Sequence, residues 1–479
     1  MHFSPTNGQS KVLIDFVIVG GGITGLACAL ALRRVGHRVI VLEKLVEDQI
    51  SQLANGGGRL PPNASKILFQ WGLESALCEF AVSPIAMEVM KYDTGDLLGT
   101  QPWESEILRE FGGQYLFYRH ADLWRLLLRT AKEAGADVRL GVRVVSIDGD
   151  DCSVKLSTGH TLRADVIVGA VGRSSNLQTV VSGDDHSLHE STQVYCRMYS
   201  VSVPSQAMIQ DSHLAQLYSR STPSTFLWLG NRCSALGSRV GGSDEFTVNF
   251  WVEQYPQTHK GEDWSPKSDL REWHEISRHC EPRLRKLIRA ASFRMCGPVK
   301  IVPQLDNWVH PSGRVIMLGE AAHSLPAGSV QPTALCIEDA AVFAKLFSHI
   351  TSETQIPTFL HAFQDLREDR CESVLHSEQR NVFFRMMPNG PEQEDRDRIM
   401  RDRHSQGLGV FDSSIADKPE VRWDSLKALF GYNAEDEADD WWFKWGLLGE
   451  RAKQRSIELE GRVGVRLQAV NIGSDDEDQ

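Results

Sequence analysis

Residues 14–25 read IDFVIVGGGITG, and this stretch decides the fold of the N-terminal part of the chain. It opens with an apolar run rich in β-branched residues, which is typical of a buried parallel strand. The run stops at Gly20, and Gly20, Gly22 and Gly25 form the spacing Gly-x-Gly-x-x-Gly. Apolar residues then recur with helical spacing as far as Val35. The stretch predicts a strand, a tight turn and a helix over about residues 24–35.

Each glycine of this motif has a separate physical role. Gly20 permits the tight turn, Gly22 lets the backbone approach a pyrophosphate, and Gly25 lets the helix pack closely on the strand. The unpaired N–H groups at the helix N-terminus favour phosphate. A second strand, residues 39–42, ends at Glu43, whose carboxylate is placed to bind an adenosine ribose. The unit predicts a dinucleotide site that suits FAD or NAD equally and disfavours the 2′-phosphate of NADP.

Other segments extend this unit into a larger fold. Residues 165–170 and 315–320 are buried-type runs that contain glycine near their ends, as parallel strands do, and a helix is expected at 333–349. Residues 195–203 and 247–252 alternate like antiparallel strands, and 268–291 is helical in pattern. We predict an α/β fold with a discontinuous, Rossmann-like cofactor domain, an inserted antiparallel sheet-plus-helix substrate domain and a helical C-terminal region. The predicted boundaries are 1–188 and 301–375 for the cofactor domain, 189–300 for the substrate domain, 376–470 for the helical region and 471–479 for an acidic tail.

Composition narrows the class of protein. The 479 residues are 41% hydrophobic and 24% charged, which is typical of a soluble globular chain of two or three domains. The net charge of -12 argues against general affinity for nucleic acid or anionic membrane. The apolar stretch 12–42 contains Asp15, Arg33 and Arg34, so we predict no membrane span. A cytoplasmic location is the expectation, and the oligomeric state stays open.

The nine cysteines are dispersed, without a Cys-x-x-Cys pair. This pattern indicates free thiols in a reducing compartment. No cluster has the ligand spacing of a zinc site, so no metal is expected.

A glycine run, residues 56–58, ends at Arg59. Backbone N–H groups at Gly58 and the fixed cation of Arg59 could bind a phosphate. A plain surface turn explains the run equally well.

Taken together, these segments resemble the FAD-dependent aromatic hydroxylases, the salicylate hydroxylase-like flavoprotein monooxygenases abundant in fungi. The resemblance covers about residues 12–375. Three motifs carry it: the glycine motif with Glu43; DVIVGAVG at 165–172; and GRVIMLGEAAH at 313–323 followed by IEDA at 337–340. Residues 60–73 also look like the fungal branch.

The resemblance implies an FAD that is reduced by NADH or NADPH and then reacts with O2 to give a C4a-hydroperoxide. That species would hydroxylate or epoxidise an aromatic, polyketide-like or other unsaturated small molecule, while the protein positions the substrate and excludes water. The resemblance also implies that Glu320 bonds the ribityl chain or ribose hydroxyls and that Arg119 lies near the pyrophosphate. Backbone N–H groups near Ser329 and Val330 would face the N1–C2 edge of the flavin.

The chain departs from the family pattern at several positions. Val171 replaces an aspartate of the second motif, and Glu320 replaces the aspartate of the third. Pro332 stands where a flexible glycine is usual, so it has no N–H to donate. The usual His-Arg pair is inverted as Arg119-His120.

The first strand of the substrate domain also differs. Ser200 stands at the place expected for an arginine, whereas Arg197 and Tyr199 lie on one face of the same strand. We take Arg197 and Tyr199 as candidates for the substrate pocket, although any alternating strand offers such residues. His323 is expected to be structural.

Two alternatives to a monooxygenase stay open at this point. Val171 and Pro332 motivate a divergent FAD-fold protein without turnover, which would serve as a binding or partner protein. A flavin oxidase or dehydrogenase, which moves hydride without oxygenating, is the third interpretation.

Overall fold

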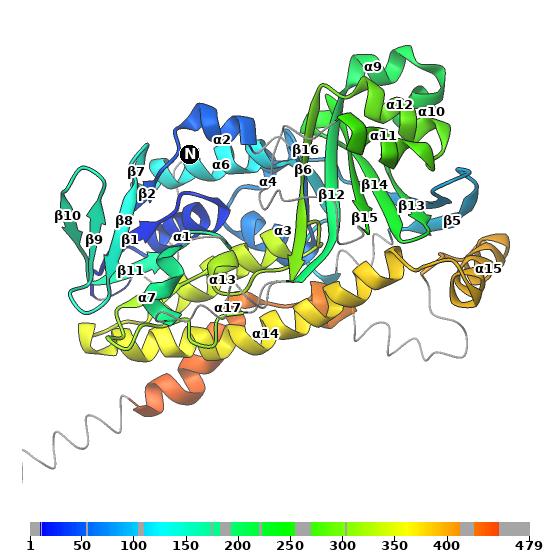
Figure 1. The fold of residues 1–479 in the computed structure, drawn as a ribbon. Coiled ribbons are helices and arrows are strands. Elements are labelled where there is room, and N and C mark those ends of the chain that lie inside the picture. Colours follow the sequence, from blue (N-terminus) through cyan, green and yellow to red (C-terminus); the bar gives the residue numbers. More distant parts are fainter. Residues whose placement is uncertain are drawn as a thin grey trace, which may run out of the picture.

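The computed structural model describes residues 10, 12–53, 56–103, 110–173, 176–182, 193–219, 223–253, 270–301, 304–411 and 426–449. Two sheets lie side by side, and the long helix α14 (Ile356–Arg385) runs beneath both of them (Figure 1). The smaller parallel sheet and its helices lie on the left of Figure 1, and the larger sheet lies on the right.

The parallel sheet builds the half of the molecule that carries the glycine motif. Its strand order is β17 (Val315–Met317), β11 (Val166–Gly169), β1 (Asp15–Val19), β2 (Arg38–Glu43) and β7 (Asp137–Leu140). Helix α1 (Ile23–Arg34) packs against α13 (Pro332–Ser348) and α6 (His120–Glu133), and its first ten residues are buried. This burial explains why its sequence is apolar nearly all round. Four of its strands lie within residues 15–169, whereas β17 begins at residue 315, after the strands of the larger sheet in sequence.

The described residues also form two small sheets. Strands β8 (Val144–Asp148), β9 (Ser153–Leu156) and β10 (Thr161–Arg163) are antiparallel, and β3 (Gly57–Leu60) pairs with β6 (Leu116–Arg119). Strands β7 and β8 are close in sequence but belong to different sheets. Gly141, at φ 74°, turns the chain between them in a conformation that favours glycine.

The larger sheet has seven strands. Their order is β16 (Phe293–Ile301), β12 (Gln193–Pro204), β15 (Glu245–Val252), β14 (Cys233–Val240), β13 (Ser224–Gly230), β4 (Ala86–Lys91) and β5 (Leu97–Pro102). All neighbours are antiparallel except β13 and β4. Strands β4 and β5 come from within residues 1–188, which the sequence analysis assigned wholly to the cofactor domain. Their place depends on pairing between β4 and β13, far apart in the chain, and no local pattern reports such a pairing.

Helices cover one face of this sheet. They are α9 (Ser205–Gln210), α10 (Ser212–Tyr218), α11 (Leu270–Arg278) and α12 (Pro282–Ala290). The helical pattern over 268–291 is two helices, because the Glu281 side chain caps a new helix that begins with Pro282.

The remaining elements are mostly helical. They are α2 (Glu47–Leu53), α3 (Pro62–Gln70), α4 (Glu74–Cys78), α7 (Thr179–Ser182), α15 (Pro391–Ser405) and α17 (Ala434–Trp441), with short turns η1 (Asn176–Gln178), η2 (Gly241–Ser243), η3 (Gly319–Ala321), η4 (Glu353–Gln355) and η5 (Trp442–Gly446). No helix in the described part of the chain, including α13 and α14, is long and apolar enough to cross a membrane. The predicted acidic tail lies outside the described residues, and all nine cysteines are free thiols.

Candidate cofactor and substrate cavities

The glycine motif forms a turn that only glycine can make. Gly20 has φ 111°, and a Cβ on it would lie 2.2 Å from the carbonyl oxygen of Ala170. A Cβ on Gly25 would lie 1.9 Å from the carbonyl oxygen of Gly20, so α1 packs directly on the turn. A Cβ on Gly22 would meet nothing within 4 Å. Gly22 is also the N-cap of α1, without a side-chain cap, so the helix N-terminus faces open space.

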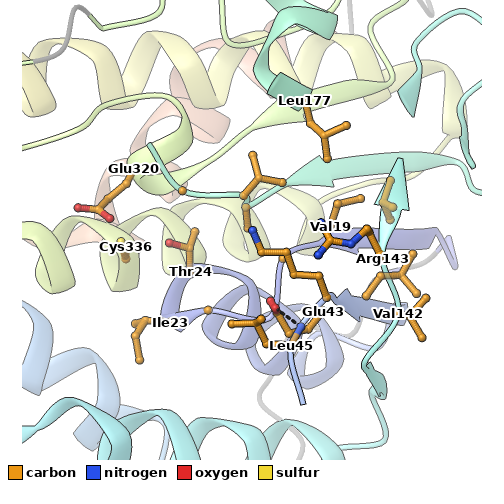
Figure 2. Close-up of a pocket in the computed structure, with 18 of the residues that line it drawn as sticks. Val19, Ile23, Thr24, Glu43, Leu45, Val142, Arg143, Leu177, Glu320 and Cys336 are labelled. Atoms are coloured by element: carbon orange, nitrogen blue, oxygen red, sulfur yellow. Dashed lines mark hydrogen bonds between the residues drawn. The ribbon is translucent and has the colours of Figure 1, made fainter. Parts of the chain in front are cut away.

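That open space is a cavity of about 730 Å³, seen from close by in Figure 2. Its lining comes from the carboxyl ends of β1, β2 and β11, from the segment before β8 and from the start of α13. The lining includes Gly20, Gly22, Ile23, Thr24, Glu43, Lys44, His120, Arg143, Ala170, Val171, Glu320, Pro332, Thr333 and Cys336. We call it the first cavity. Its place, at the carboxyl ends of parallel strands, is where α/β sheets bind ligands.

Glu43 is anchored at one side of the first cavity. Its Oε2 accepts a hydrogen bond from the N–H of Gly21 at 2.7 Å, and its Oε1 accepts one from the N–H of Leu45 at 2.8 Å. The residue is only 9% exposed. The two backbone donors hold the carboxylate at the end of β2, beside the glycine turn.

Glu320 lies on the other side of α1's N-terminus from Glu43, as Figure 2 shows. Its Oε1 accepts a hydrogen bond from Nη2 of Arg173 at 2.5 Å. His120 lines the same cavity, and burial lowers the pKa of its imidazole while Glu320 partly opposes that effect. A neutral imidazole and a carboxylate therefore lie close to the start of α13.

Arg119 does not line the first cavity. Its guanidinium bonds Asp122 at 3.0 Å and Glu245 at 3.4 Å instead. The next residue, His120, lines the cavity wall, whereas Arg119 pairs with neighbouring acids.

The first cavity fits FAD. Glu43 offers acceptors for ribose hydroxyls, the uncapped N-terminus of α1 offers N–H groups for the pyrophosphate, and Glu320 offers a carboxylate further along. Val171 adds an apolar contact to the wall. Pro332 is the first residue of α13, where a helix needs no N–H, so it does not disturb the helix.

The loop before α13 carries Ser329 and Val330. Oε1 of Glu378, on α14, accepts hydrogen bonds from the N–H groups of Val330 at 2.7 Å and Gln331 at 2.9 Å. Two of the N–H groups that the resemblance implied for the flavin edge are thus bonded to this carboxylate. Thr333 remains at the first cavity, and its hydroxyl bonds that of Tyr118 at 2.7 Å.

Gly58 and Arg59 lie on β3, away from the wall of the first cavity. A Cβ on Gly58 would lie 2.6 Å from the ring of Tyr118, so glycine is needed for close packing. The guanidinium of Arg59 donates to the carbonyl oxygens of Gly328 and, at 2.9 Å, Ser329. Arg59 therefore braces the loop and lines a second cavity, rather than the phosphate end of the first.

The second cavity has a volume of about 1190 Å³ and is largely apolar. It lies between the larger sheet, the loop before α13 and the end of α14. Its lining includes Arg59, Met87, Gln101, Trp103, Phe111, Tyr115, Leu227, Leu236, Val330, Glu378, Phe383, Phe384, Arg385, Phe411, Leu429 and Phe430. A large apolar cavity with a few converging polar groups is typical of a small-molecule site.

Arg197 and Tyr199 line neither cavity. Both lie on the helix-covered face of the larger sheet: Nε of Arg197 lies 3.7 Å from the carboxylate of Glu272, and the Tyr199 hydroxyl bonds the same carboxylate at 3.4 Å. Tyr199 also packs edge-on against Trp273, with ring centroids 5.3 Å apart. The sequence showed that the strand alternates, but it did not show which face the helices cover.

Several lining residues of the second cavity were missed by the sequence analysis. Trp103 and Tyr115 lie before α6, and Glu378 and Arg385 lie beyond 375 in the predicted helical C-terminal region. One signal in the sequence could have identified two of these residues. Glu378 and Arg385 are seven residues apart, so both charged side chains lie on one face of a helix.

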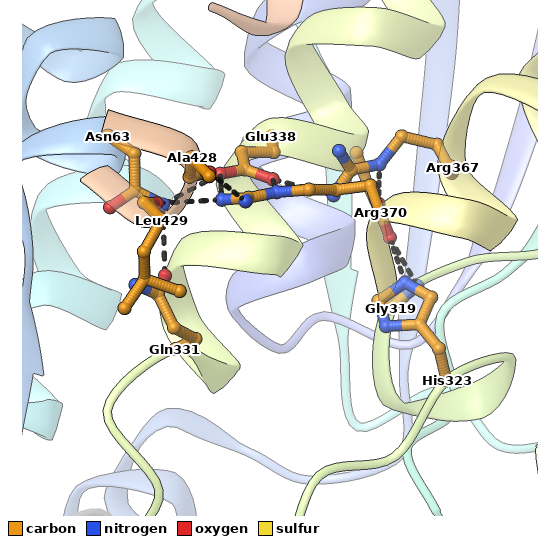
Figure 3. A network of polar contacts seen from close by, with 10 residues as sticks. Asn63, Gly319, His323, Gln331, Glu338, Arg367, Arg370, Ala428 and Leu429 are labelled. Atoms are coloured by element: carbon orange, nitrogen blue, oxygen red, sulfur yellow. Dashed lines mark hydrogen bonds and ion pairs between the residues drawn. The ribbon is translucent and has the colours of Figure 1, made fainter. Parts of the chain in front are cut away.

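A buried ionic network ties α13 to α14 and surrounds His323 (Figure 3). Asp339 accepts hydrogen bonds from His323 at 2.6 Å, Arg367 at 2.8 Å and the N–H of Gly319 at 2.9 Å. Burial alone would raise the pKa of Asp339, but His323 and Arg367 lower it below its usual value. Arg367 also bonds Glu338 at 2.9 Å. His323 is 2% exposed and lines neither cavity.

Known proteins resemble this chain along most of its length. A family model described as an FAD binding domain matches residues 14–378. The FAD-dependent monooxygenase OpS4 of Beauveria bassiana (strain ARSEF 2860) is 27% identical over 435 residues, covering 90% of this chain and 98% of the relative. Hispidin-3-hydroxylase of Neonothopanus nambi is 27% identical over 424 residues, covering 81% and 93%.

Solved structures share the fold. CtdE in complex with FAD and its substrate 4 has a TM-score of 0.72 at 18% identity and covers 91% of this chain and 100% of its own. A salicylate hydroxylase substrate complex has a TM-score of 0.66 at 18% identity, covering 90% and 98%. The mixed α/β architecture with a parallel-sheet cofactor domain and a helical C-terminal region is thus the fold of these proteins.

Proposed function

This chain belongs to the FAD binding domain family and is an FAD-dependent monooxygenase, and from that premise we propose that it hydroxylates a hydrophobic aromatic small molecule held in the second cavity. NADH or NADPH would serve as the reductant and O2 as the oxygen donor.

The observation that carries this proposal is the loop at the start of α13, which lies between the two cavities. Val330 lines the second cavity, whereas Pro332 and Thr333 line the first. A cofactor that extends from the glycine turn to this loop would present its ring system to a substrate on the other side. Two cavities that meet at one short loop suit transfer of an atom from cofactor to substrate.

The residues proposed to hold FAD are those whose geometry fits it. Gly20, Gly22 and Gly25 shape the turn for the pyrophosphate, Glu43 bonds the adenosine ribose, and Glu320 bonds hydroxyls nearer the reacting end. When bound and reduced, FAD would supply the activation of O2, of which one atom enters the substrate and the other leaves as water. Ser329 and Val330 are proposed to lie at the reacting end of the cofactor through their place in the loop.

The chain's own contribution to the reaction would be to position the substrate and exclude water. The wall of the second cavity is mainly aromatic and aliphatic, so it favours an apolar ring. A dry cavity also protects a reactive oxygen species from loss to water.

The test begins with the absorbance spectrum of the purified protein and with anaerobic reduction by NADPH and by NADH. We expect flavin bands that bleach and recover in air. A protein that stays colourless after addition of FAD would overturn the proposal in favour of a fold without turnover. A protein that consumes NADPH but incorporates no oxygen into any aromatic compound tested would favour an oxidase or dehydrogenase.

A matched pair of glycine variants tests the first cavity directly. Gly22→Leu places a side chain in the open space at the N-terminus of α1, and we expect the folded protein to lose FAD. Gly449→Leu, at another position where a Cβ meets nothing within 4 Å, should keep it. Retention of FAD in Gly22→Leu would contradict the assignment of this cavity.

A further inference from the structure

Three charged side chains gather where the second cavity meets the loop before α13. Arg59 comes from β3, and Glu378 and Arg385 come from one face of α14, two turns apart. The Cζ atom of Arg385 lies 4.4 Å from the centroid of the Trp251 ring, and its Nε donates to the carbonyl oxygen of Asn381 at 3.3 Å. The guanidinium of Arg385 is thus held in place on an aromatic ring.

These groups are only partly satisfied within the protein. Arg59 is bonded to two loop carbonyls, and one oxygen of Glu378 is bonded to two loop N–H groups. Nη1 of Arg385 and Oε2 of Glu378 are buried, and neither has a hydrogen-bond partner among the described residues. Buried polar atoms of this kind are costly unless something bonds them. Arg385 and Glu378 both line the second cavity, so a ligand there can reach the two side chains.

The cluster also has an excess of positive charge. Two guanidinium groups face one carboxylate, and Glu378 is only 1% exposed. Burial lowers the pKa of Arg385 to about 10, and the repulsion from Arg59 acts in the same direction. Burial raises the pKa of Glu378, against the opposing effects of Arg59 and Arg385. Both pKa shifts indicate that the low-polarity surroundings raise the free energy of the charged forms of Arg385 and Glu378. An anion bound beside Arg385 would offset this free-energy cost for the guanidinium.

The rest of the wall is suited to a flat apolar ring. Trp103 stacks on Tyr115 with ring centroids 4.8 Å apart and planes at 17°, and Phe430 meets Tyr115 edge-on at 6.2 Å. Phe384 and Phe411 pack edge-on at 5.9 Å. Aromatic walls of this kind favour stacked or edge-on contact with another ring.

We propose that Arg385 is the specificity-determining residue of the second cavity and that it binds an anionic oxygen, of an ionised phenol, an enol or a carboxylate, on a hydrophobic aromatic substrate. This inference rests on the proposed function and names the substrate class within it. The guanidinium of Arg385, which lines the cavity, donates to the anionic oxygen, while the aromatic wall contacts the rings. Glu378 holds the loop through its Oε1, and its negative charge partly neutralises the positive charges of Arg59 and Arg385.

The experiment measures binding of probe pairs to the FAD-loaded enzyme by equilibrium dialysis. The first pair is 2-naphthoate and 2-naphthamide, which match in size and differ in charge. The second pair is ionised 4-nitro-1-naphthol and its methyl ether, which tests a phenolate against a neutral ring. We expect each anion to bind about tenfold more tightly than its neutral partner. The pair that shows the larger ratio of anion to neutral affinity identifies the anionic group, carboxylate or phenolate, that the cavity favours.

Variants then connect the preference to Arg385. Arg385→Gln should abolish the preference for the anion and change binding of the neutral probes by less than about twofold, and Arg385→Lys should keep part of it. Arg398→Gln, an exposed arginine on α15, should leave all four affinities unchanged. Glu378→Gln removes a negative charge and keeps an acceptor for the loop, so we expect the anions to bind a few-fold more tightly.

Two results would overturn the inference: equal binding of anionic and neutral probes in the unmodified enzyme, or an anion preference that survives in Arg385→Gln. If Arg385→Gln fails to fold, the Glu378→Gln variant tests the inference instead. Weaker binding of the anionic probes to Glu378→Gln would contradict the proposed charge balance. Flavin content and NADPH oxidation are measured on the same samples. An enzyme that turns over without preferring anions defeats this inference alone, whereas anion binding without flavin chemistry defeats the proposed function alone.

Discussion

The N–H of Val330 donates a hydrogen bond to Oε1 of Glu378 at 2.7 Å, and this contact joins the loop between the two cavities to the second half of α14. The same oxygen accepts from Gln331 at 2.9 Å. The C-terminal helical region therefore holds the loop at the point where we propose that cofactor and substrate meet.

Loss of the Glu378 carboxylate should loosen this loop. In Glu378→Ala, two N–H groups lose their acceptor, so we expect the free energy of unfolding to fall by about 1–3 kcal/mol and FAD to dissociate more readily. Thermal unfolding and the flavin fluorescence released on dilution measure the two effects. Glu372→Ala, an exposed position on the same helix, is the control. Unchanged stability in Glu378→Ala would mean that the loop does not depend on this contact.

Removal of the Glu43 carboxylate should weaken FAD binding without unfolding the protein. Glu43→Ala deletes the acceptor proposed for the ribose, and we expect the Kd for FAD to rise about tenfold to a hundredfold. Titration of the apoprotein with FAD, followed by flavin fluorescence, gives the Kd. Glu47→Ala, exposed at the start of α2, should behave like the unmodified protein. Equal Kd values for all three proteins would argue against Glu43 as a cofactor residue.

The buried ionic network predicts a large loss of stability when its arginine is removed. Arg367→Met leaves Asp339 and Glu338 with fewer partners in the interior, and we expect the free energy of unfolding to fall by about 3–5 kcal/mol. Urea unfolding followed by circular dichroism measures it. Arg398→Met breaks exposed ion pairs and should cost less than about 1 kcal/mol. Similar losses in the two variants would show that the network contributes little.

His37 predicts how stability depends on pH. Burial lowers the pKa of its imidazole to about 4, while a hydrogen bond to the carbonyl of Phe347 opposes the shift and Arg33 adds to it. A pKa depressed in the folded state means that stability is present above the unfolded value of 6.5 and is lost as pH falls towards 4.

We therefore expect His37→Gln to flatten the pH dependence of the free energy of unfolding between pH 6.5 and 4 by up to about 1.4 kcal/mol per pH unit. Urea unfolding at a series of pH values provides the curves. The exposed His361 serves as the control, since His361→Gln should leave the slope as it is. The prediction fails when the His37 variant retains the full slope.

Tyr199 should be dispensable for activity, because it lies on the helix-covered face of the larger sheet. Tyr199→Phe loses a hydrogen bond to Glu272, so stability should fall by about 1 kcal/mol. NADPH oxidation and substrate KM should stay within about twofold, and steady-state kinetics checks this. A large rise in KM would return Tyr199 to the list of substrate-binding residues.

The local parts of this fold could be predicted from the sequence, because short-range patterns encode them. The turn at Gly20, the helix after it and the position of Glu43 at the end of β2 all follow from spacing within about thirty residues. The break at Pro282 was missed, although the Glu-Pro pair is a helix-start signal.

The parts that could not be predicted depend on contacts between distant segments. The pairing of β4 with β13 and the faces of β12 are set by packing, so residues 86–102 and Arg197 were misplaced. The second cavity takes its wall from segments near Trp103, Leu227 and Arg385, and no local spacing connects these residues.

The edge position of β17 has a consequence for how the protein is made. β17 leads into η3, whose Glu320 lines the first cavity together with the start of α13, and all three elements follow the larger sheet along the chain. During synthesis, the glycine turn emerges from the ribosome early and must wait until the chain beyond Ser348 has emerged before its cavity is closed. The larger sheet has all its strands by Ile301, so it can assemble first. We therefore expect the cofactor to bind late in the biogenesis of this protein, once α13 has joined the fold.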